Sequence, residues 1–539
     1  MNSSPGLIAL RFRIGVTGHR WEVGRAPASV VEDVHAAIDR IVELLALDPT
    51  ESTPVTTTVV SALAEGADRL VAHDVLARPG TRLEVILPFE PSVYLADFAE
   101  AASREEFEEL LSRASATMTV QPRKTRPLTY REAGEQMVDR CDIVVAVWDG
   151  EQGDIGGTSD VVGSVRKRGL PMVWVDARAG GFVEEVGGVV RPLTNEDVCP
   201  LRARAFARLD RYNREHVPVL GDASLIDGKA SEQAVRNSVA FGDDRVRRVL
   251  DWAQPYYARA ENVARAWQRR YEATEVLLYL CSSLAVFVVA AQVAFFPGHN
   301  EIVLAEAALL AFAILVLWTV RRRRLHDRWI SARHLAEWIR ASFFVRATGL
   351  PVRASLPGVD DASDPEGAWV GRARLEIACE QPEPSLTEAD VPQLRTLLSQ
   401  FWVEHQHRYF ERAAKRNEQR DVTLRRVTAA LLACSIVFAL LHALSIGDED
   451  IEHIWVFGSI TLPVVGAAVH AIATARDYRR HARRYDVMAR ELALARPSID
   501  AAHGLRGLRT AAANVEHVVT REAQDWFGDV RLKDPELPF

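Results

Sequence analysis

VLLYLCSSLAVFVVAAQVAFF, residues 276 to 296, is the stretch that decides the fold of this chain. A short PGHNE connector follows it, and then a second apolar run, IVLAEAALLAFAILVLWTV, from Ile302 to Val320. A helix of about 20 residues rises roughly 30 Å, which is the thickness of a bilayer core. A soluble helix rarely stays apolar around its whole circumference for that length, because one face must meet water. The pattern therefore favours a transmembrane hairpin over a helical hairpin buried in a large soluble core.

A second apolar hairpin, Val427 to Ile446 and Ile454 to Thr474, repeats the arrangement. Arg328 and Arg484, 156 positions apart, occupy matching places after the two hairpins, which indicates an internal duplication. Basic residues flank both hairpins, whereas the two connectors carry no Lys or Arg. Because basic loops stay in the cytoplasm, we expect a multi-pass protein of the inner membrane with both termini and the central region inside.

Residues 10 to 180 alternate short β-rich runs with helical periodicity. FRIGVTG (Phe12 to Gly18) and LEVILPF (Leu83 to Phe89) are predicted strands, and DIVVAVWDG (Asp142 to Gly150) and PMVWVDA (Pro171 to Ala177) read as strands covered on both faces. Strands that alternate with helices indicate an open parallel sheet. The predicted fold is therefore an α/β Rossmann-like domain followed by an all-α membrane region with two transmembrane hairpins and long cytoplasmic helices.

The same patterns predict the boundaries of five regions. They are a Rossmann-like domain over 10–180, a linker or small extension over 181–242, a first two-helix membrane module over 243–350, a cytoplasmic loop over 351–393, and a second module with a C-terminal helix over 394–539. The spans are expected at 276–296, 302–320, 427–446 and 454–474. After Val320 we expect the helix to continue into the cytoplasm through RRRRLHDRW.

Charge and cysteine content indicate which kinds of ligand and partner to expect. The formal charge of −8 over 539 residues is mild, so it does not favour nucleic acid. Five cysteines show no CxxC or His/Cys ligand spacing, and we therefore expect no metal site and no resident cofactor.

Three glycine loops follow predicted strands, at the edge where ligands bind in open α/β sheets. Tight turns need glycine in any case, so one such loop is weak evidence, but three together predict a phosphate-bearing or nucleotide-derived ligand. The candidate ligand-binding residues are Gly15, Thr17, Gly18, His19 and Arg20 in the first loop, Glu65 and Gly66 in the second, and Asp149, Gly156, Gly157 and Thr158 in the third.

The motifs VTGHR, ALAEGADRL and GGTSD over residues 11 to 177 resemble the SLOG family, the Rossmann-like nucleotide-ligand domains related to the LOG phosphoribohydrolases. LOG-type enzymes carry PGGxGTxxE, in which the acidic residue assists glycosidic cleavage. The corresponding position in this chain is Val161, and Asp160 lies one residue early, about 100° away on a helix. The resemblance therefore implies ligand binding more than hydrolysis, with no catalytic residue assigned.

The hairpins with their basic helices are similar to SLATT domains, the two-helix membrane modules found beside SLOG sensors in bacterial conflict and antiphage systems. This resemblance implies a homo-oligomeric effector in which a nucleotide-derived signal opens or disrupts the bilayer. Two alternatives stay open. One is a membrane-tethered nucleotide hydrolase with Asp160, Glu65 or Asp149 as acid or base, and the other is a constitutive channel or transporter.

The charge asymmetry predicts which loops an impermeant thiol reagent reaches in intact cells. A cysteine placed at Gly298 or Asp450, in the connectors, should be labelled, whereas one at Ser363 should not. Unsubstituted protein reports the background from the native cysteines. Labelling at Ser363 but at neither connector would reverse the topology.

Overall fold

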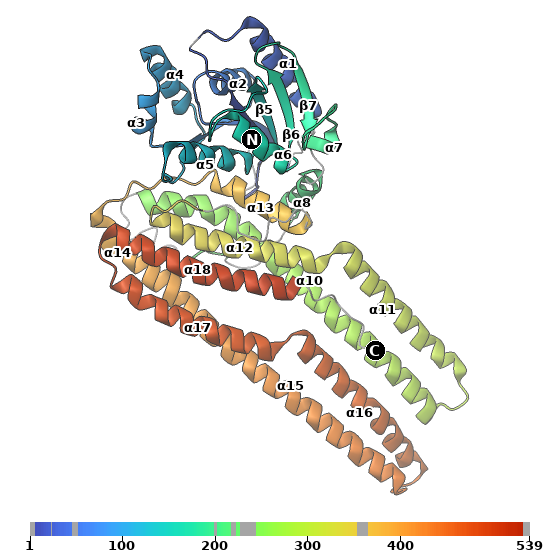
Figure 1. The fold of residues 1–539 in the computed structure, drawn as a ribbon. Helices are drawn as coiled ribbons and strands as arrows, with labels where there is room; N and C mark the ends of the chain where they lie inside the picture. Colours follow the sequence, from blue (N-terminus) through green and yellow to red (C-terminus); the bar gives the residue numbers. More distant parts are fainter. Residues whose placement is uncertain are drawn as a thin grey trace. The chain divides into compact units, whose positions relative to one another are not determined.

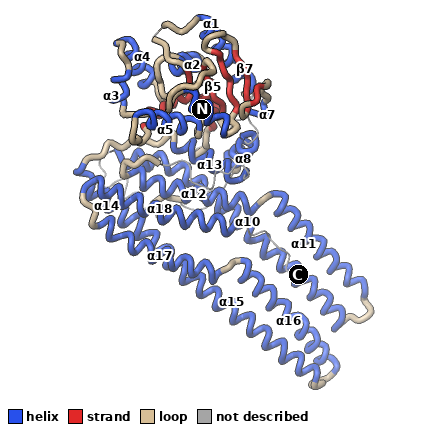
Figure 2. The backbone as a smooth tube through the Cα atoms, viewed as in Figure 1, coloured by secondary structure: helices blue, strands red, loops and turns tan. Residues whose placement is uncertain are grey.

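A computed structural model describes residues 6–22, 24–45, 52–198, 202–216, 223–226, 244–352 and 365–531. The chain divides into two compact units. The sheet unit comprises Leu7–Glu215 and Ala354–Glu380, and the helical unit comprises Met1–Gly6, His216–Arg353 and Gln381–Phe539. Strands lie in the first unit and long helices in the second (Figure 2), which confirms the predicted fold class.

In the described part of the sheet unit, eight strands form one sheet in the order β4-β3-β2-β1-β5-β6-β7-β8. The strands from β1 to β6 pair in parallel, and β7 and β8 add an antiparallel edge. Their bounds are β1 (Leu10–Gly18), β2 (Val55–Ser61), β3 (Arg82–Leu87), β4 (Ala116–Thr119), β5 (Ile143–Trp148), β6 (Pro171–Asp176), β7 (Phe182–Val186) and β8 (Val189–Val190). The chain order reverses at β1, which lies between β2 and β5.

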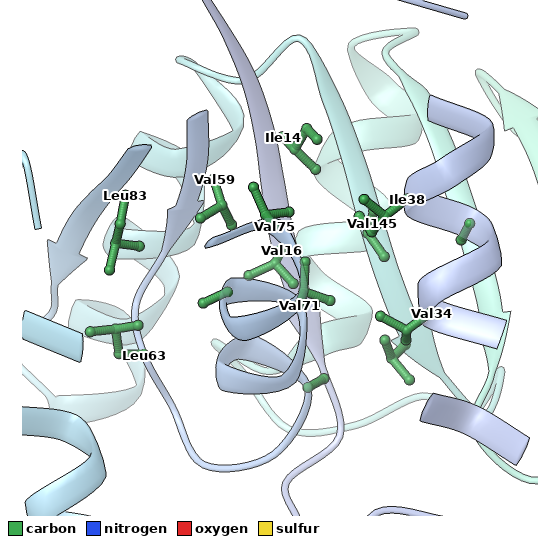
Figure 3. Packing of buried hydrophobic residues seen from close by; sticks show 14 of the residues in the cluster. Ile14, Val16, Val34, Ile38, Val59, Leu63, Val71, Val75, Leu83 and Val145 are labelled. Atoms are coloured by element: carbon green, nitrogen blue, oxygen red, sulfur yellow. The ribbon is translucent and has the colours of Figure 1, made fainter. Parts of the chain in front are cut away.

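Alternating side chains of the strands build a core on each face of the sheet. On one face, Ile14 and Val16 of β1 pack with apolar residues of α1 (Ala28–Leu44) and α2 (Ala67–Leu76), as Figure 3 shows. On the other face, Val144 and Ala146 of β5 pack with α5 (Arg126–Val138) and α6 (Thr158–Lys167). Because both faces are covered, β1 and β5 are almost wholly buried.

Shorter helices complete the sheet unit around these layers. They are α3 (Pro91–Tyr94) with the 3-10 turn η1 (Leu95–Asp97), α4 (Ala101–Ser112), α7 (Asn195–Val198) and α8 (Arg202–Arg214).

One helix of the sheet unit comes from a distant part of the sequence. Where the sequence predicted a loop over 351–393, the structure forms α13 (Pro365–Ala378), and this helix packs against α8 and β1. Arg11 and Arg13 of β1 alternate with the apolar residues of the α1–α2 face, so they point to the opposite face, where α13 contributes its carboxylates.

The contact between β1 and α13 is a buried network of charges. Glu376 of α13 accepts from Arg11 Nη1 at 2.9 Å and from Arg13 Nη1 at 2.8 Å, and Arg13 Nε also reaches Glu84 Oε2 at 2.9 Å. Arg372 of α13 pairs with Asp142 at 2.9 Å. Burial acts to raise the pKa of Glu376, but Arg13, Arg372 and Arg11 outweigh it, and the pKa is lowered. The carboxylate is therefore ionised, and its partners hold it in place.

Two long hairpins dominate the described part of the helical unit (Figure 1). Helices α10 and α11 form the first hairpin and continue into α12, and α15 and α16 form the second and continue into α17; α10 also contacts α16. The bounds are α10 (Asp244–Phe295), η3 (Asn300–Ile302), α11 (Val303–Arg323), α12 (Leu325–Ala347), η4 (Glu388–Asp390), α14 (Val391–Thr396), the π-helix η5 (Leu397–Glu404), α15 (His405–Ala443), α16 (Glu449–Ala475), α17 (Tyr478–Asp500) and α18 (Gly504–Arg531).

Four helical stretches among the described residues are long and apolar enough to cross a membrane. Only 6% to 22% of their most apolar windows is buried within the protein, so most of this surface faces outward. Apolar side chains cannot face water along helices of this length. A bilayer is the environment that suits these outward-facing apolar surfaces.

The helix predicted to run on past Val320 is in fact broken at Arg324, whose φ is +48°. The second hairpin has the same break at Asp477, φ +44°, 153 positions later rather than the predicted 156. Non-glycine residues adopt this left-handed conformation rarely. Each break separates an apolar helix from a second helix of 23 residues, so both hairpins end in a defined elbow.

We expect α13 to be required for the stability of the sheet unit. In a protein that joins residues 7–215 to 354–380 through a flexible linker, Glu376→Gln should lower the free energy of unfolding by about 3 kcal/mol, because it leaves two buried guanidiniums short of a carboxylate. Glu380→Gln, at the half-exposed rim of the same network, should cost less than about 1 kcal/mol. Urea unfolding followed by circular dichroism measures both, and equal midpoints would contradict this account.

Candidate functional site

A cavity of about 450 Å³ opens at the carboxyl end of β1, and the loops that follow β2 and β5 contribute to its lining together with α5 and the start of α6. This is the place where the strand order reverses, and open α/β sheets bind ligands at such points. Of the residues predicted from the sequence, those that line the cavity are Thr17, Gly18, His19, Arg20, Gly156, Gly157 and Thr158. The first and third glycine loops are thus brought together.

The other four predicted residues, Gly15, Glu65, Gly66 and Asp149, are not among the lining residues. Gly15 is required for packing, since a Cβ there would lie 2.4 Å from Met137 Sδ on α5. Gly66 has φ +91°, and its Cβ would lie 2.4 Å from the carbonyl oxygen of His19. These two glycines let α2 and α5 approach β1 closely, and their part in the site is to shape it.

His19 is oriented by a carboxylate at the end of β5. Its Nε2 lies 3.2 Å from Asp149 Oδ2, and Arg178 Nη2 reaches the same oxygen at 2.8 Å. The backbone N–H of Glu151 donates to Asp149 Oδ1, and together with His19 and Arg178 it lowers the pKa of Asp149. Asp149 is therefore an ionised anchor that presents the His19 ring to the cavity.

The other two carboxylates considered as catalytic groups are also engaged in local contacts. Glu65 accepts a short hydrogen bond from Ser103 Oγ. Asp160 Oδ2 accepts from the Gly156 backbone N–H at 2.6 Å and pairs with Arg131 at 2.8 Å. Burial acts to raise the pKa of Asp160, but these two partners outweigh it, and the pKa is lowered. Both carboxylates fasten loops that border the cavity.

The start of α6 forms the anion-attracting side of the cavity. Gly157 is the N-cap residue and Thr158 begins the helix, so the positive end of the helix dipole points at this wall. Gly156 has φ +82°, and a Cβ there would lie 2.4 Å from the carbonyl oxygen of Pro127. The tight turn therefore needs this glycine, and it places Gly156, Gly157 and Thr158 in the lining of the cavity.

The lining also contains residues that sequence reasoning missed, and one of them, Tyr130, lies directly beside Gly156. Tyr130 of α5 and Tyr94 of α3 line the cavity with ring centroids 6.3 Å apart, and the Arg20 guanidinium lies 5.9 Å from the Tyr130 ring. Neither tyrosine belongs to a local motif, because each comes from a helix that only the tertiary fold brings to β1. The aromatic wall offers a planar surface on which a ring can stack.

Asp68 is the buried acid of the cavity. It lies in the first turn of α2, and its Oδ2 accepts from Ser61 Oγ at 3.1 Å and from the Ala64 backbone N–H at 3.4 Å. Burial raises the pKa of Asp68 to about 6. The residue stands within ALAEGADRL, and the signal was available there, since the first turn of a helix after a strand points toward the sheet edge. The sequence analysis chose Glu65 instead.

The lining combines two cations and the start of α6 with aromatic and acidic groups. Arg20, His19 and the start of α6 suit an anion such as a phosphate, and Tyr130 and Asp68 suit a ring with polar substituents. Among the residues that the structure describes, no cluster of three His, Cys, Asp or Glu is placed to hold a metal ion.

The second hairpin has a counterpart among known families. Residues 400–526 match the family described as SMODS and SLOG-associating 2TM effector domain 1. The match contains α15, α16 and α17, and it indicates a membrane effector module. The SLATT part of the predicted resemblance is thereby supported, whereas the SLOG part rests on the motifs alone. No curated protein matches the chain.

Asp68 should make stability depend on pH. Between about pH 4 and pH 6 the folded protein keeps a proton that the unfolded chain has released, so the contribution of Asp68 to stability falls as the pH rises. Asp68→Asn removes this loss, and relative to the wild type the variant should gain about 3 kcal/mol between pH 4 and pH 7. Melting temperatures of the two proteins across this range test it, and a constant difference would contradict the assignment.

Proposed function

We propose that this protein is a membrane effector of a bacterial conflict system, in which a nucleotide-derived small molecule binds the sheet unit and gates the two hairpins. The observation that carries the proposal is the cavity at the reversal of strand order, in the same chain as four membrane-spanning stretches. The match to a two-helix effector domain supports the output half of this function.

The size and lining of the cavity support the choice of ligand. A volume of about 450 Å³ lies within the range of small-molecule sites, roughly 300–1,000 Å³. A phosphate would lie against the first turn of α6 near Gly157 and Thr158, with Arg20 as its counter-charge. The base or ribose would then face Tyr130 and Asp68. This orientation places each polar group of a nucleotide beside a partner of suitable chemistry.

The effector half requires several copies of the chain. Two hairpins contribute four spans, and their apolar windows are mostly outward-facing, so one protomer has little polar surface with which to enclose a water path. One polar contact inside the second hairpin, Ser435 Oγ to the Ser459 carbonyl at 3.1 Å, joins α15 to α16 rather than lining a channel. A homo-oligomer is therefore the arrangement that we propose for the open state.

The membrane-tethered hydrolase is less well supported. Its three candidate acids or bases are occupied: Asp149 with His19 and Arg178, Asp160 with Gly156 and Arg131, and Glu65 with Ser103. The position that carries the acidic residue in LOG-type enzymes is Val161, which lines the cavity as an apolar side chain.

Gly157→Glu should abolish ligand binding without unfolding the protein. The new carboxylate would lie where we place the phosphate, against helix N–H groups, so binding should weaken by at least about 100-fold. Gly157→Ala is the matched control, because its φ of −89° is ordinary and the added Cβ meets only the Asp154 carbonyl at 3.1 Å.

Mass spectrometry of nucleotides that co-purify with each full-length protein provides the measurement, and the identified nucleotide is then added to ion-loaded liposomes. The wild type and Gly157→Ala should carry the nucleotide as purified and, once it has been removed by dialysis, should leak only when it is added back, and Gly157→Glu should do neither. A leak of equal size without any nucleotide would establish a constitutive channel instead.

A further inference from the structure

The segment that carries α13 leaves the helical unit and returns to it, and hydrogen bonds join the residues at which it leaves and returns. The chain leaves the helical unit after Arg353 and returns at Gln381. Where it leaves and returns, the Val352 backbone N–H donates to Gln381 Oε1 at 2.9 Å, and Arg346 Nε of α12 donates to the Pro382 carbonyl at 2.7 Å. Ala378, the last residue of α13, therefore lies four positions before Pro382, whose carbonyl contacts α12, the helix that follows α11 beyond the elbow.

Within the sheet unit, α13 is joined to the wall of the cavity. Asp142 follows α5 by four residues; its Oδ1 pairs with Arg372 of α13 at 2.9 Å, and its Oδ2 accepts from the Arg13 backbone N–H at 2.6 Å. Helix α5 carries Tyr130 and Met137 into the lining of the cavity. β1 makes the second connection, since Arg13 pairs with Glu376 and the same strand ends at the cavity with Thr17.

We propose that α13 is the output helix of the sheet unit: docked on β1 it holds the hairpins closed, and ligand binding in the cavity releases it. This proposal rests on the proposed function and names how the site is regulated. The ligand acts by binding more tightly to the arrangement of α5 and β1 from which α13 is released, because only such a difference in affinity shifts an equilibrium.

A buried charge network suits this role because it has few intermediate states. With α13 docked, Glu376 and Arg372 have partners at 2.8–2.9 Å, and with α13 released the same groups are solvated. A partial displacement would leave buried charges without partners, which is unfavourable relative to either end state. The contact is therefore two-state, as a switch requires.

Substitutions that weaken docking should open the protein without any ligand. We would remove co-purified nucleotide by dialysis and reconstitute full-length wild type, Glu376→Gln and Glu185→Gln, with no nucleotide added, in KCl-loaded liposomes of phosphatidylethanolamine and phosphatidylglycerol. Glu185 of β7 is the matched control, because it is an equally buried carboxylate of the same unit. It pairs with Arg166 of α6 at 2.7 Å, and β7 is three strands away from β1 in the sheet. We expect Glu376→Gln to leak at least about tenfold faster than the other two proteins.

Hydrogen exchange separates release of α13 from general unfolding. In Glu376→Gln, amides of residues 365–378 should exchange at least about tenfold faster than in the wild type, while those of β5 stay protected. The role of α13 would be overturned if Glu376→Gln did not leak faster than the wild type, or if Glu185→Gln leaked as fast as Glu376→Gln. A wild type that leaks without nucleotide would instead overturn the proposed function, whereas Glu376→Gln should bind the nucleotide at least as tightly as the wild type, because release of α13 favours the arrangement that the ligand prefers.

Discussion

The pairing of two arginines in the middle of a buried strand is the constraint on which this structure depends. Arg11 and Arg13 are nearly inaccessible to solvent, and β1 occupies the centre of the sheet. Charges at such depth require partners, because a single unpaired ion is far more costly to bury than a paired one. Glu84 supplies one partner from within the sheet, and Glu376 comes from a helix more than 350 positions away. The sheet unit therefore cannot be a continuous stretch of sequence.

The parts of the fold that follow from local periodicity could be read from the sequence. β5 is a continuous apolar run, and the hairpins are apolar for the full thickness of a bilayer, so each pattern identifies its own environment. Helix α13 could not be read in the same way. Its charged residues look like a solvated surface in the sequence PEGAWVGRARLEIA, but Glu376 is buried against the arginines of β1 and Arg372 pairs with Asp142.

The residues of the candidate site also fall into those that the sequence predicted and those that only the tertiary structure revealed. The glycine loops were visible because tight turns leave a local signature, and Gly156 and Gly157 do border the cavity. Gly15 and Gly66 carry the same signature for a different reason, the close packing of α5 and α2 on β1. Tyr94 and Tyr130 have no signature, since an aromatic residue on a helix is equally suited to a core. Local sequence shows where the backbone turns sharply, and the tertiary fold determines which turns meet a ligand.

The excursion of the chain through the sheet unit also sets an order for biosynthesis. At roughly 5–20 residues per second, a ribosome needs about 20–70 s to proceed from Arg13 to Glu376. During that interval the first hairpin emerges and enters the bilayer, while β1 still lacks the carboxylate that completes its burial. The sheet unit is thus finished only after the chain is anchored in the membrane.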